Sequence, residues 1–364
     1  MNEFARNAIE ERGGQPNHLS PAGLEPPFIL TASTRHWLPS DAERQASVAR
    51  FRRFSVSFTL FTVTLFFMQP CLFSISYGGL WGQASLDLPA FVAKAASLGY
   101  RSVMLAGKRP HLSPLDYSAD RVAELKAVLD EYDVSCPVVA AYTDFAGMPT
   151  AEVPAIEMQI AYVESLCRMG QGLGAHIVRV FTAYETNSQP LTTIWNRVVG
   201  ALREACDRAA TFGFTVAIQN HHDVGVDSEA LLELLNDIDR PNCKLGFDAW
   251  SPALRGEDIY EAALEMAPHT VLTTNADYVC LPRYQYRPEF VNYERVEPDL
   301  VRAVPFGEGF IDYESFFAGL RDGGFAGIAT YEMCSPLRGG GSMANLDRCS
   351  AQYLRWLAET GQIS

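Results

Sequence analysis

Apolar and polar residues follow a regular order from Cys71 almost to the end of the chain. Short apolar runs, typical of buried parallel strands, alternate with longer stretches in which apolar residues recur every three or four positions, as on one face of a helix. The runs predict strands at residues 72–77, 100–106, 134–141, 175–181, 215–219, 243–248, 270–274 and 327–332. The longer stretches predict helices at residues 87–98, 119–132, 154–169, 191–212, 228–237, 258–267, 313–321 and 345–359.

Eight strand–helix units of this kind predict a (β/α)₈ TIM barrel. The competing fold is an open, doubly wound sheet, which usually has a Gly-rich turn after its first strand. The turn here, Tyr77-Gly78-Gly79-Leu80-Trp81-Gly82, does not match the dinucleotide-binding pattern. The barrel is therefore the preferred fold.

Residues 1–67 lack this order and are predicted to be a disordered or accessory extension before a barrel of residues 68–364. Within the extension, an apolar run at residues 54–68 follows three arginines. The run is shorter than the roughly 20 residues that span a bilayer. Membrane anchoring through residues 54–68 is kept as the alternative to a cytoplasmic protein.

One connection interrupts the rhythm, because residues 277–308 contain no convincing helix. A loop of this length is unusual in a compact domain. It is rich in Tyr and Arg, including Arg283, which suits a lid or a wall for a sugar. An ordered surface excursion, or a subunit contact in a homo-oligomer, is the other interpretation.

The charge balance excludes one class of partner. The chain has 29 Lys and Arg against 43 Asp and Glu, a formal net charge of −14, so binding to nucleic acid is not expected. The eight cysteines are scattered without a Cys-x-x-Cys pair, which favours a reduced, intracellular protein and speaks against structural zinc.

Polar residues with catalytic or ligand chemistry stand at the ends of four predicted strands. Gln219, Asn220, His221 and His222 follow one strand, and Asp248, the pair Thr274 and Asn275, and Glu332 end three others. Alternate residues of a strand share a face, so Gln219 and His221 are predicted to point the same way and His222 the other way. In a closed barrel these strand ends converge at one mouth.

These strand ends resemble the xylose isomerase-like sugar isomerases and epimerases, a family of metal-dependent barrels. In that family strand five often ends Glu-Asn-His, strand six ends in Asp, strand seven carries His-x-Lys-Asp, and strand eight ends in Glu. Here Gln219-Asn220-His221, Asp248 and Glu332 match three of these, with Gln in place of Glu. The stretch from Gly307 to Asp312 matches the family's Gly-x-Gly-x-x-Asp. The strand-seven motif differs from the family's His-x-Lys-Asp, because Thr274-Asn275-Ala276-Asp277 keeps only the Asp.

The resemblance implies a divalent metal, with Mn²⁺, Mg²⁺ or Co²⁺ favoured and Zn²⁺ compatible with imidazole ligation. The implied ligands are Gln219, His221, Asp248 and Glu332. A metal of this kind stabilises the enediolate formed when a base removes a proton next to a carbonyl. Glu332, His221 and Glu185 are the candidate catalytic groups. Gln219 cannot act as a base.

The implied substrate is a sugar or a sugar phosphate. Lys108, Arg109 and His111 form a compact cationic group after the second strand, suited to a phosphate or carboxylate. The other candidate substrate contacts are His222, Asn275 and Arg283.

The favoured function is a sugar or sugar-phosphate isomerase or epimerase. A lyase or dehydratase on the same barrel is the first alternative, because one catalytic carboxylate is replaced by Gln219. A barrel that binds a carbohydrate without turnover is the second. The superfamily's abasic-site nuclease branch fits least, because Ser251 stands where its Asp-x-x-His motif would place His.

Overall fold

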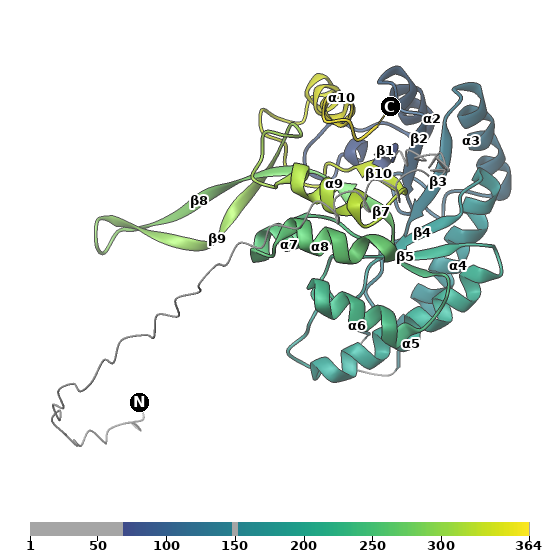
Figure 1. Ribbon diagram of the computed structural model, residues 1–364, viewed down its shortest axis with the longest axis horizontal. Coiled ribbons are helices and arrows are strands. Elements are labelled where there is room, and N and C mark those ends of the chain that lie inside the picture. Colours follow the sequence, from purple (N-terminus) through teal and green to yellow (C-terminus); the bar gives the residue numbers. More distant parts are fainter. Residues whose placement is uncertain (1–67, 148–151, 364) are drawn as a thin grey trace, which may run out of the picture. The chain divides into compact units, whose positions relative to one another are not determined.

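The structure is a computed structural model that describes residues 68–147 and 152–363. Eight parallel strands close into a barrel in the order β1-β10-β7-β6-β5-β4-β3-β2, which confirms the predicted TIM barrel (Figure 1). The strands are β1 Gln69–Phe73, β2 Ser102–Ala106, β3 Ser135–Ala140, β4 Ile177–Val180, β5 Thr215–Gln219, β6 Cys243–Gly246, β7 Thr270–Asn275 and β10 Ile328–Tyr331.

Helices cover the outside of the barrel. They are α2 Leu88–Ser97, α3 Ala119–Glu131, α4 Ala155–Leu173, α5 Leu191–Ala210, α6 Ser228–Ile238, α7 Trp250–Arg255, α8 Ile259–Met266, α9 Tyr313–Asp322 and α10 Met343–Glu359. The sequence did not predict α7, which has only six residues and too little periodicity to be recognised. Among the described residues, no helix is both long and apolar enough to cross a membrane. The predicted extension, residues 1–67, lies outside the described residues, as does all of the apolar run at 54–68 except Met68.

The first strand begins and ends earlier than predicted. The strand expected at 72–77 ends at Phe73, and Ser74–Tyr77 forms a 3₁₀ turn. Two serine hydroxyls in this turn accept backbone N–H groups, Ser74 Oγ from Ala106 and Ser76 Oγ from Met333, both at 2.9 Å. The turn is therefore fixed by polar contacts that apolar periodicity does not reveal.

The last strand closes the barrel against the first. Strand β10 pairs in parallel with β1 on one side and with β7 on the other. Helix α10 packs over this seam, where Tyr77 donates a hydrogen bond of 3.0 Å to Asp347, 270 residues away. Tyr100 adds a second buried bond, 2.8 Å to the carbonyl of Ser350.

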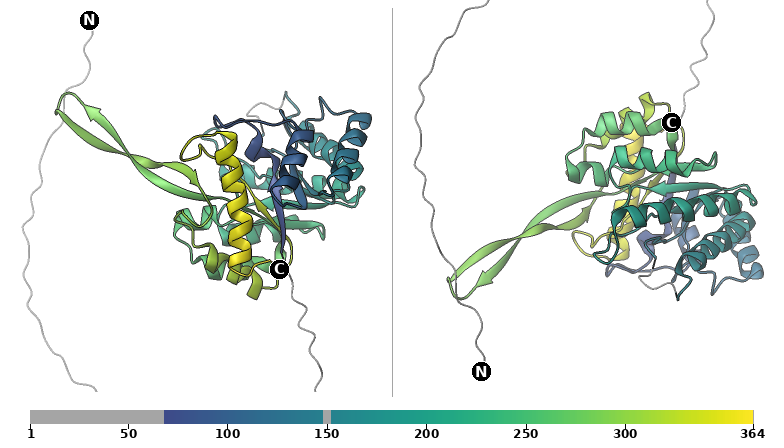
Figure 2. Two further views of the ribbon diagram at one scale, coloured as in Figure 1. Left: turned by 90° about the horizontal axis from the view of Figure 1, so that it is seen from above. Right: turned by 90° about the horizontal axis from the view of Figure 1, so that it is seen from below.

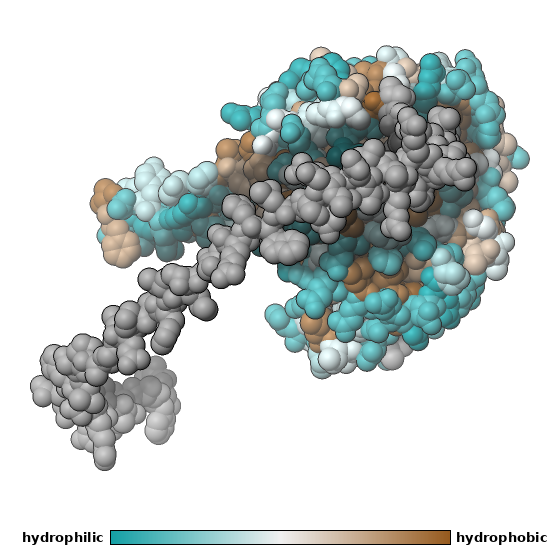
Figure 3. All heavy atoms as spheres, viewed as in Figure 1, coloured by the Kyte–Doolittle hydropathy of each residue, from teal (hydrophilic) through white to brown (hydrophobic). Residues whose placement is uncertain are grey.

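Segment 277–308, in which the sequence predicts no helix, forms an antiparallel hairpin over most of its length. Strands β8 Asp277–Arg287 and β9 Asn292–Val304 project from the barrel as a two-stranded arm (Figures 1 and 2). Tyr286 pairs with Tyr293 across the arm, and both side chains are exposed. At the turn Phe290 is 75% exposed, and the end of the arm shows as a hydrophobic spot in Figure 3. Only the root of the arm reaches the barrel mouth.

Candidate active site

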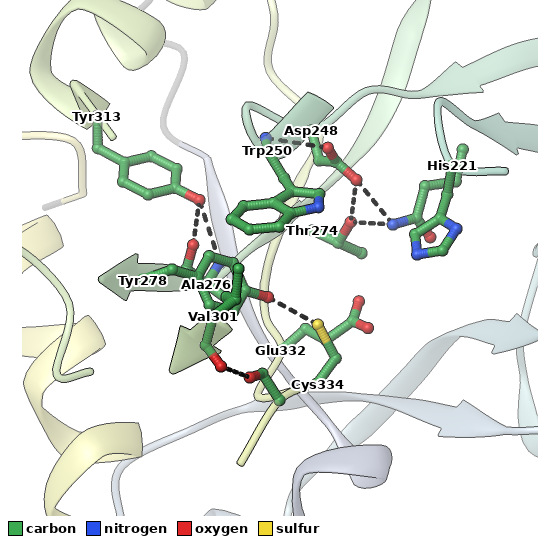
Figure 4. A pocket seen from close by; sticks show the side chains of 12 residues that line it. His221, Asp248, Trp250, Thr274, Ala276, Tyr278, Val301, Tyr313, Glu332 and Cys334 are labelled. Carbon is green, nitrogen blue, oxygen red and sulfur yellow. Dashed lines mark hydrogen bonds between the residues drawn. The ribbon is translucent and has the colours of Figure 1, made fainter. Parts of the chain in front are cut away.

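A cavity of about 220 Å³ opens at the carboxyl ends of the strands (Figure 4). It is lined by Gln219, His221, Asp248, Trp250, Thr274, Ala276, Tyr278, Val301, Tyr313, Glu332, Cys334 and Ser335. Four of these residues, Gln219, His221, Asp248 and Glu332, are the metal ligands that the sequence suggests. The structure thus brings the ends of β5, β6, β7 and β10 to one small site, as expected for this barrel.

Asn220 fixes two neighbouring strand ends to each other. Its Oδ1 accepts the backbone N–H of Asp248 at 2.8 Å, and its Nδ2 donates to the backbone carbonyl of Asp248 at 3.0 Å. Ser251 donates to the carbonyl of Asn220 at 2.8 Å. The buried amide thereby sets the position of Asp248 relative to Gln219.

Asp248 accepts hydrogen bonds from neutral groups only. Gln219 Nε2 donates to Asp248 Oδ2 and to Thr274 Oγ1, both at 2.8 Å, and the backbone of Trp250 donates to Asp248 Oδ1 at 3.1 Å. Burial raises the pKa of Asp248 to about 7, although the bond from Gln219 opposes the shift, and the nearby charge of Glu332 raises it further. Asp248 can therefore hold a proton near neutral pH, as a general acid requires.

Glu332, just after β10, carries the second carboxylate. Its Oε2 is buried without a hydrogen-bond partner. Burial raises the pKa of Glu332, and the charge of Arg179, a hydrogen bond with Cys334 and the charge of Lys108 oppose the shift. An unpartnered carboxylate oxygen beside a cavity is available to accept a proton from a ligand.

Arg179 on β4 was missed by the sequence analysis. It is fully buried, in phase with Ile177 on the barrel-interior side of the strand. Its guanidinium lies 4.0 Å from the ring centroid of Phe181 and 4.9 Å from that of Tyr142. The signal in the sequence was a single charged residue inside the apolar run at 175–181.

His221 and His222 have different surroundings. His221 lines the cavity, and the backbone N–H of His222 donates to its Nδ1 at 2.8 Å. His222 has a positive φ of 70° and lies between Phe181 and Tyr184, at centroid distances of 4.4 and 3.9 Å. Burial is the main cause that lowers the pKa values, to about 4 for His221 and about 3 for His222. His221 is thus a neutral imidazole at the cavity, whereas His222 is outside the lining.

An aromatic wall completes the cavity. Trp250 and Tyr278 lie with ring centroids 4.3 Å apart, and Tyr313 donates a hydrogen bond of 2.7 Å to the carbonyl of Ala276. Tyr278 comes from the root of the arm. Of segment 277–308, it is therefore this root that forms part of the cavity wall. Apolar ring faces of this kind suit the C–H face of a sugar.

Several predicted site residues lie away from the cavity. Arg109 is exposed and forms a 2.7 Å ion pair with Asp116, and His111 is buried against Phe91, 3.2 Å from the carbonyl of Leu86. Arg283 lies on the exposed part of the arm, where it donates to the carbonyl of Pro298, and Glu185 is exposed.

Asn275 points to the opposite face of β7 from Thr274. Its Nδ2 donates to the hydroxyl of Tyr353 at 3.0 Å and to the carbonyl of Thr330 at 3.1 Å. Successive side chains of a strand alternate between faces, so only one of the two residues can reach the cavity.

The residues of the cavity fit a divalent cation poorly. In the part of the chain that the structure describes, no three His, Cys, Asp or Glu side chains form a group that could hold a metal ion. Gln219 directs an N–H donor toward Asp248, while its Oε1 has no partner. The cations Lys108 and Arg179 lie near Glu332, where their charges would oppose a metal.

The glycine stretch after the arm is positioned by Asp277. The Oδ2 atom of Asp277 accepts the backbone N–H groups of Gly307 at 3.0 Å and Gly309 at 2.7 Å. A Cβ atom on Gly309 would overlap the carboxylate of Asp277 and lie 2.6 Å from the backbone nitrogen of Tyr278. The retained Asp and the glycines thus form one turn beside the aromatic wall.

We expect Gly309→Ala to destabilise the protein by about 1–3 kcal/mol, because the added methyl group displaces Asp277 or the backbone of Tyr278. Chemical denaturation of both proteins measures the change. Gly200→Ala on α5 is the matched control, since nothing lies within 4 Å of its added Cβ, and it should not lose stability. Equal stability of Gly309→Ala and the wild type would contradict the role given to this turn.

Comparison with known proteins agrees with the barrel fold. The model of the family described as xylose isomerase-like TIM barrel matches residues 92–359. Among solved structures, D-allulose 3-epimerase from Methylomonas sp. in complex with D-allulose has a TM-score of 0.62 at 17% identity, covering 81% of this chain and 97% of its own. The probable 3-DHS dehydratase from Bacillus anthracis has a TM-score of 0.59 at 16% identity, covering 79% and 98%. No curated protein matches. With three quarters of its length matched by the family model, the chain belongs to the xylose isomerase-like TIM barrel family.

Proposed function

We propose that the protein is an enzyme that moves a proton next to the carbonyl group of a sugar or sugar derivative, as an isomerase or epimerase does. The observation that carries the proposal is the pair of carboxylates, Asp248 and Glu332, at one cavity with the neutral imidazole of His221. Two groups that can accept and donate a proton around one carbon are the minimum for this chemistry.

In this mechanism Glu332 is the base. Its unpartnered Oε2 removes the proton from the carbon beside the carbonyl. The protonated Glu332 then returns the proton to the same carbon or to the neighbouring carbon, on the same face of the substrate. Asp248, with its raised pKa, donates a proton to the developing alkoxide. Trp250 and Tyr278 hold the apolar face of the substrate and limit the access of water.

The metal-assisted form of this reaction stays a prediction of the sequence. If a divalent ion were bound, Asp248 and Glu332 would be its anionic ligands, and it would polarise the carbonyl as a Lewis acid. Because the donor set fits such an ion poorly, none of the steps above depends on it.

A dehydratase is the second candidate. Because residue 219 is Gln, the cavity holds one acid, Asp248, and one base, Glu332, rather than two opposed bases. A protonated Asp248 could then assist a leaving hydroxyl group after Glu332 removes the α-proton. The probable dehydratase among the similar folds is compatible with this alternative.

The test is incubation of the full chain with ketoses, aldoses, their phosphates and sugar acids in deuterated water. Isomerase or epimerase activity adds deuterium to recovered substrate and product, as followed by mass spectrometry. Dehydratase activity gives a product lighter by one water. Neither label nor water loss with any compound would favour the barrel that binds without turnover.

A further inference from the structure

A buried positive charge without an ion pair lies next to the cavity. Arg179 Nη1 donates to the backbone carbonyl of Ala141 at 3.0 Å, but its buried Nε has no partner. Among the residues that the structure describes, no carboxylate lies within ion-pair distance of Arg179. Burying an unpaired charge opposes folding strongly, so the residue needs a reason other than stability.

Lys108, just after β2, is a second cation at the same place. Its Nζ lies 3.6 Å from the ring centroid of Tyr142, the ring that Arg179 also contacts. Lys108 is half-buried and also forms no ion pair with a described residue, whereas its neighbour Arg109 is paired with Asp116. An aromatic ring holds a cation in place without neutralising it.

The two cations outnumber the anions they face. Glu332 is the nearby carboxylate that their charges influence, and it lies beyond ion-pair distance of both. One positive charge is therefore in excess here, in a protein whose formal net charge is −14. Such a local excess attracts an anion.

We propose that Lys108, Arg179 and Tyr142 form a carboxylate-binding subsite beside Glu332, and that the substrate is a sugar acid. Lys108, the accessible member, makes the direct contact, and Arg179 adds its charge from the barrel interior. A carboxylate brings one negative charge, which matches the excess. A phosphate brings about 1.5–2 negative charges, more than the excess, and would leave net negative charge next to Glu332. The assignment rests on the proposed function, since it places the acid group beside the base.

Thermal unfolding of the full chain tests the subsite without requiring turnover. The probes are sugar acids of four to seven carbons, including D-gluconate and D-galacturonate, with D-galactose and inorganic phosphate for comparison. We expect at least one sugar acid to raise the wild-type Tm by several degrees at saturation, with D-galactose and phosphate giving little shift. Lys108→Met should abolish the shift. Lys126→Met, which removes the same charge from α3, should keep it.

Arg179→Met gives a second readout. Replacing an unpaired buried charge by an apolar side chain of similar length should raise the Tm of the unliganded protein while removing the effect of the acids. If Arg179 only supports the fold, its loss should lower the Tm instead.

The proposal is overturned if no sugar acid shifts the Tm, if D-galactose or phosphate shifts it as much, or if Lys108→Met keeps the full shift. Deuterium exchange separates it from the proposed function. If sugar acids bind through Lys108 but show no proton exchange, the subsite is supported and the proposed function is contradicted. If only neutral sugars show proton exchange, the proposed function is supported and the carboxylate-binding subsite is contradicted.

Discussion

In Glu332→Gln, deuterium exchange at the carbon next to the substrate carbonyl should fall by about 10²–10⁴-fold, the usual effect of losing a positioned base. The amide is nearly isosteric with the carboxylate but cannot accept the proton. The fold should be preserved, because the shape of the side chain hardly changes and the buried Oε2 of Glu332 has no hydrogen-bond partner to lose. Exchange is followed by mass spectrometry with the substrate that gives the fastest wild-type reaction.

Two further variants make this result specific. Glu261→Gln removes an exposed carboxylate from α8 and should leave exchange unchanged. Glu185→Gln tests the other acid that the sequence proposed as catalytic. Undiminished exchange in Glu332→Gln would exclude Glu332 as the base and move the search to His221 and Glu185.

The double variant Gln219→Glu/Thr274→His should gain a divalent metal site. Thr274 is in contact with Gln219 at the cavity and occupies the position of the family's strand-seven His. The two changes add a carboxylate and an imidazole to Asp248 and Glu332, which gives four ligands of the type that Mn²⁺ and Co²⁺ accept. At a metal concentration 100 times the dissociation constant, the expected stabilisation is about 2.7 kcal/mol, measured as a rise in Tm.

The matched control adds Asp248→Asn to the double variant. This change removes one ligand with little change in shape, so the rise in Tm with metal should be lost. The wild type should show little shift with the same ions. If the wild type were stabilised by Mn²⁺ as strongly as the double variant, its own donor set would hold a metal, and the metal-assisted mechanism would gain support.

Periodicity was sufficient for the barrel because its strands and helices are regular and short. Strand β5, Thr215–Gln219, lies in the stretch where the sequence predicts it and ends where the apolar run meets the polar cluster. The inward or outward direction of a side chain was harder to predict. Parallel strands are buried on both faces, so polarity does not show which of Thr274 and Asn275 enters the cavity. For the same reason Arg179 gave no sign that it faces the interior.

The arm was missed for a different reason. Pro282 interrupts β8, and the register shifts between Leu281 and Arg283. Pro298 interrupts β9 as well. Proline inside a run normally counts against a strand, and alternation is lost on both sides of a bulge. Local rules therefore indicate a loop, although the two runs pair over most of their length.

The seam between β1 and β10 also has a consequence during synthesis on the ribosome. Strand β1 leaves the ribosome first, but one of its edges has no partner until β10 at Ile328–Tyr331 has followed. Helix α10, which packs over the seam, emerges later still. Contacts this far apart in sequence form slowly, and exposed strand edges favour aggregation. Nascent chains should therefore depend on chaperones until β10 has been made and the barrel has closed.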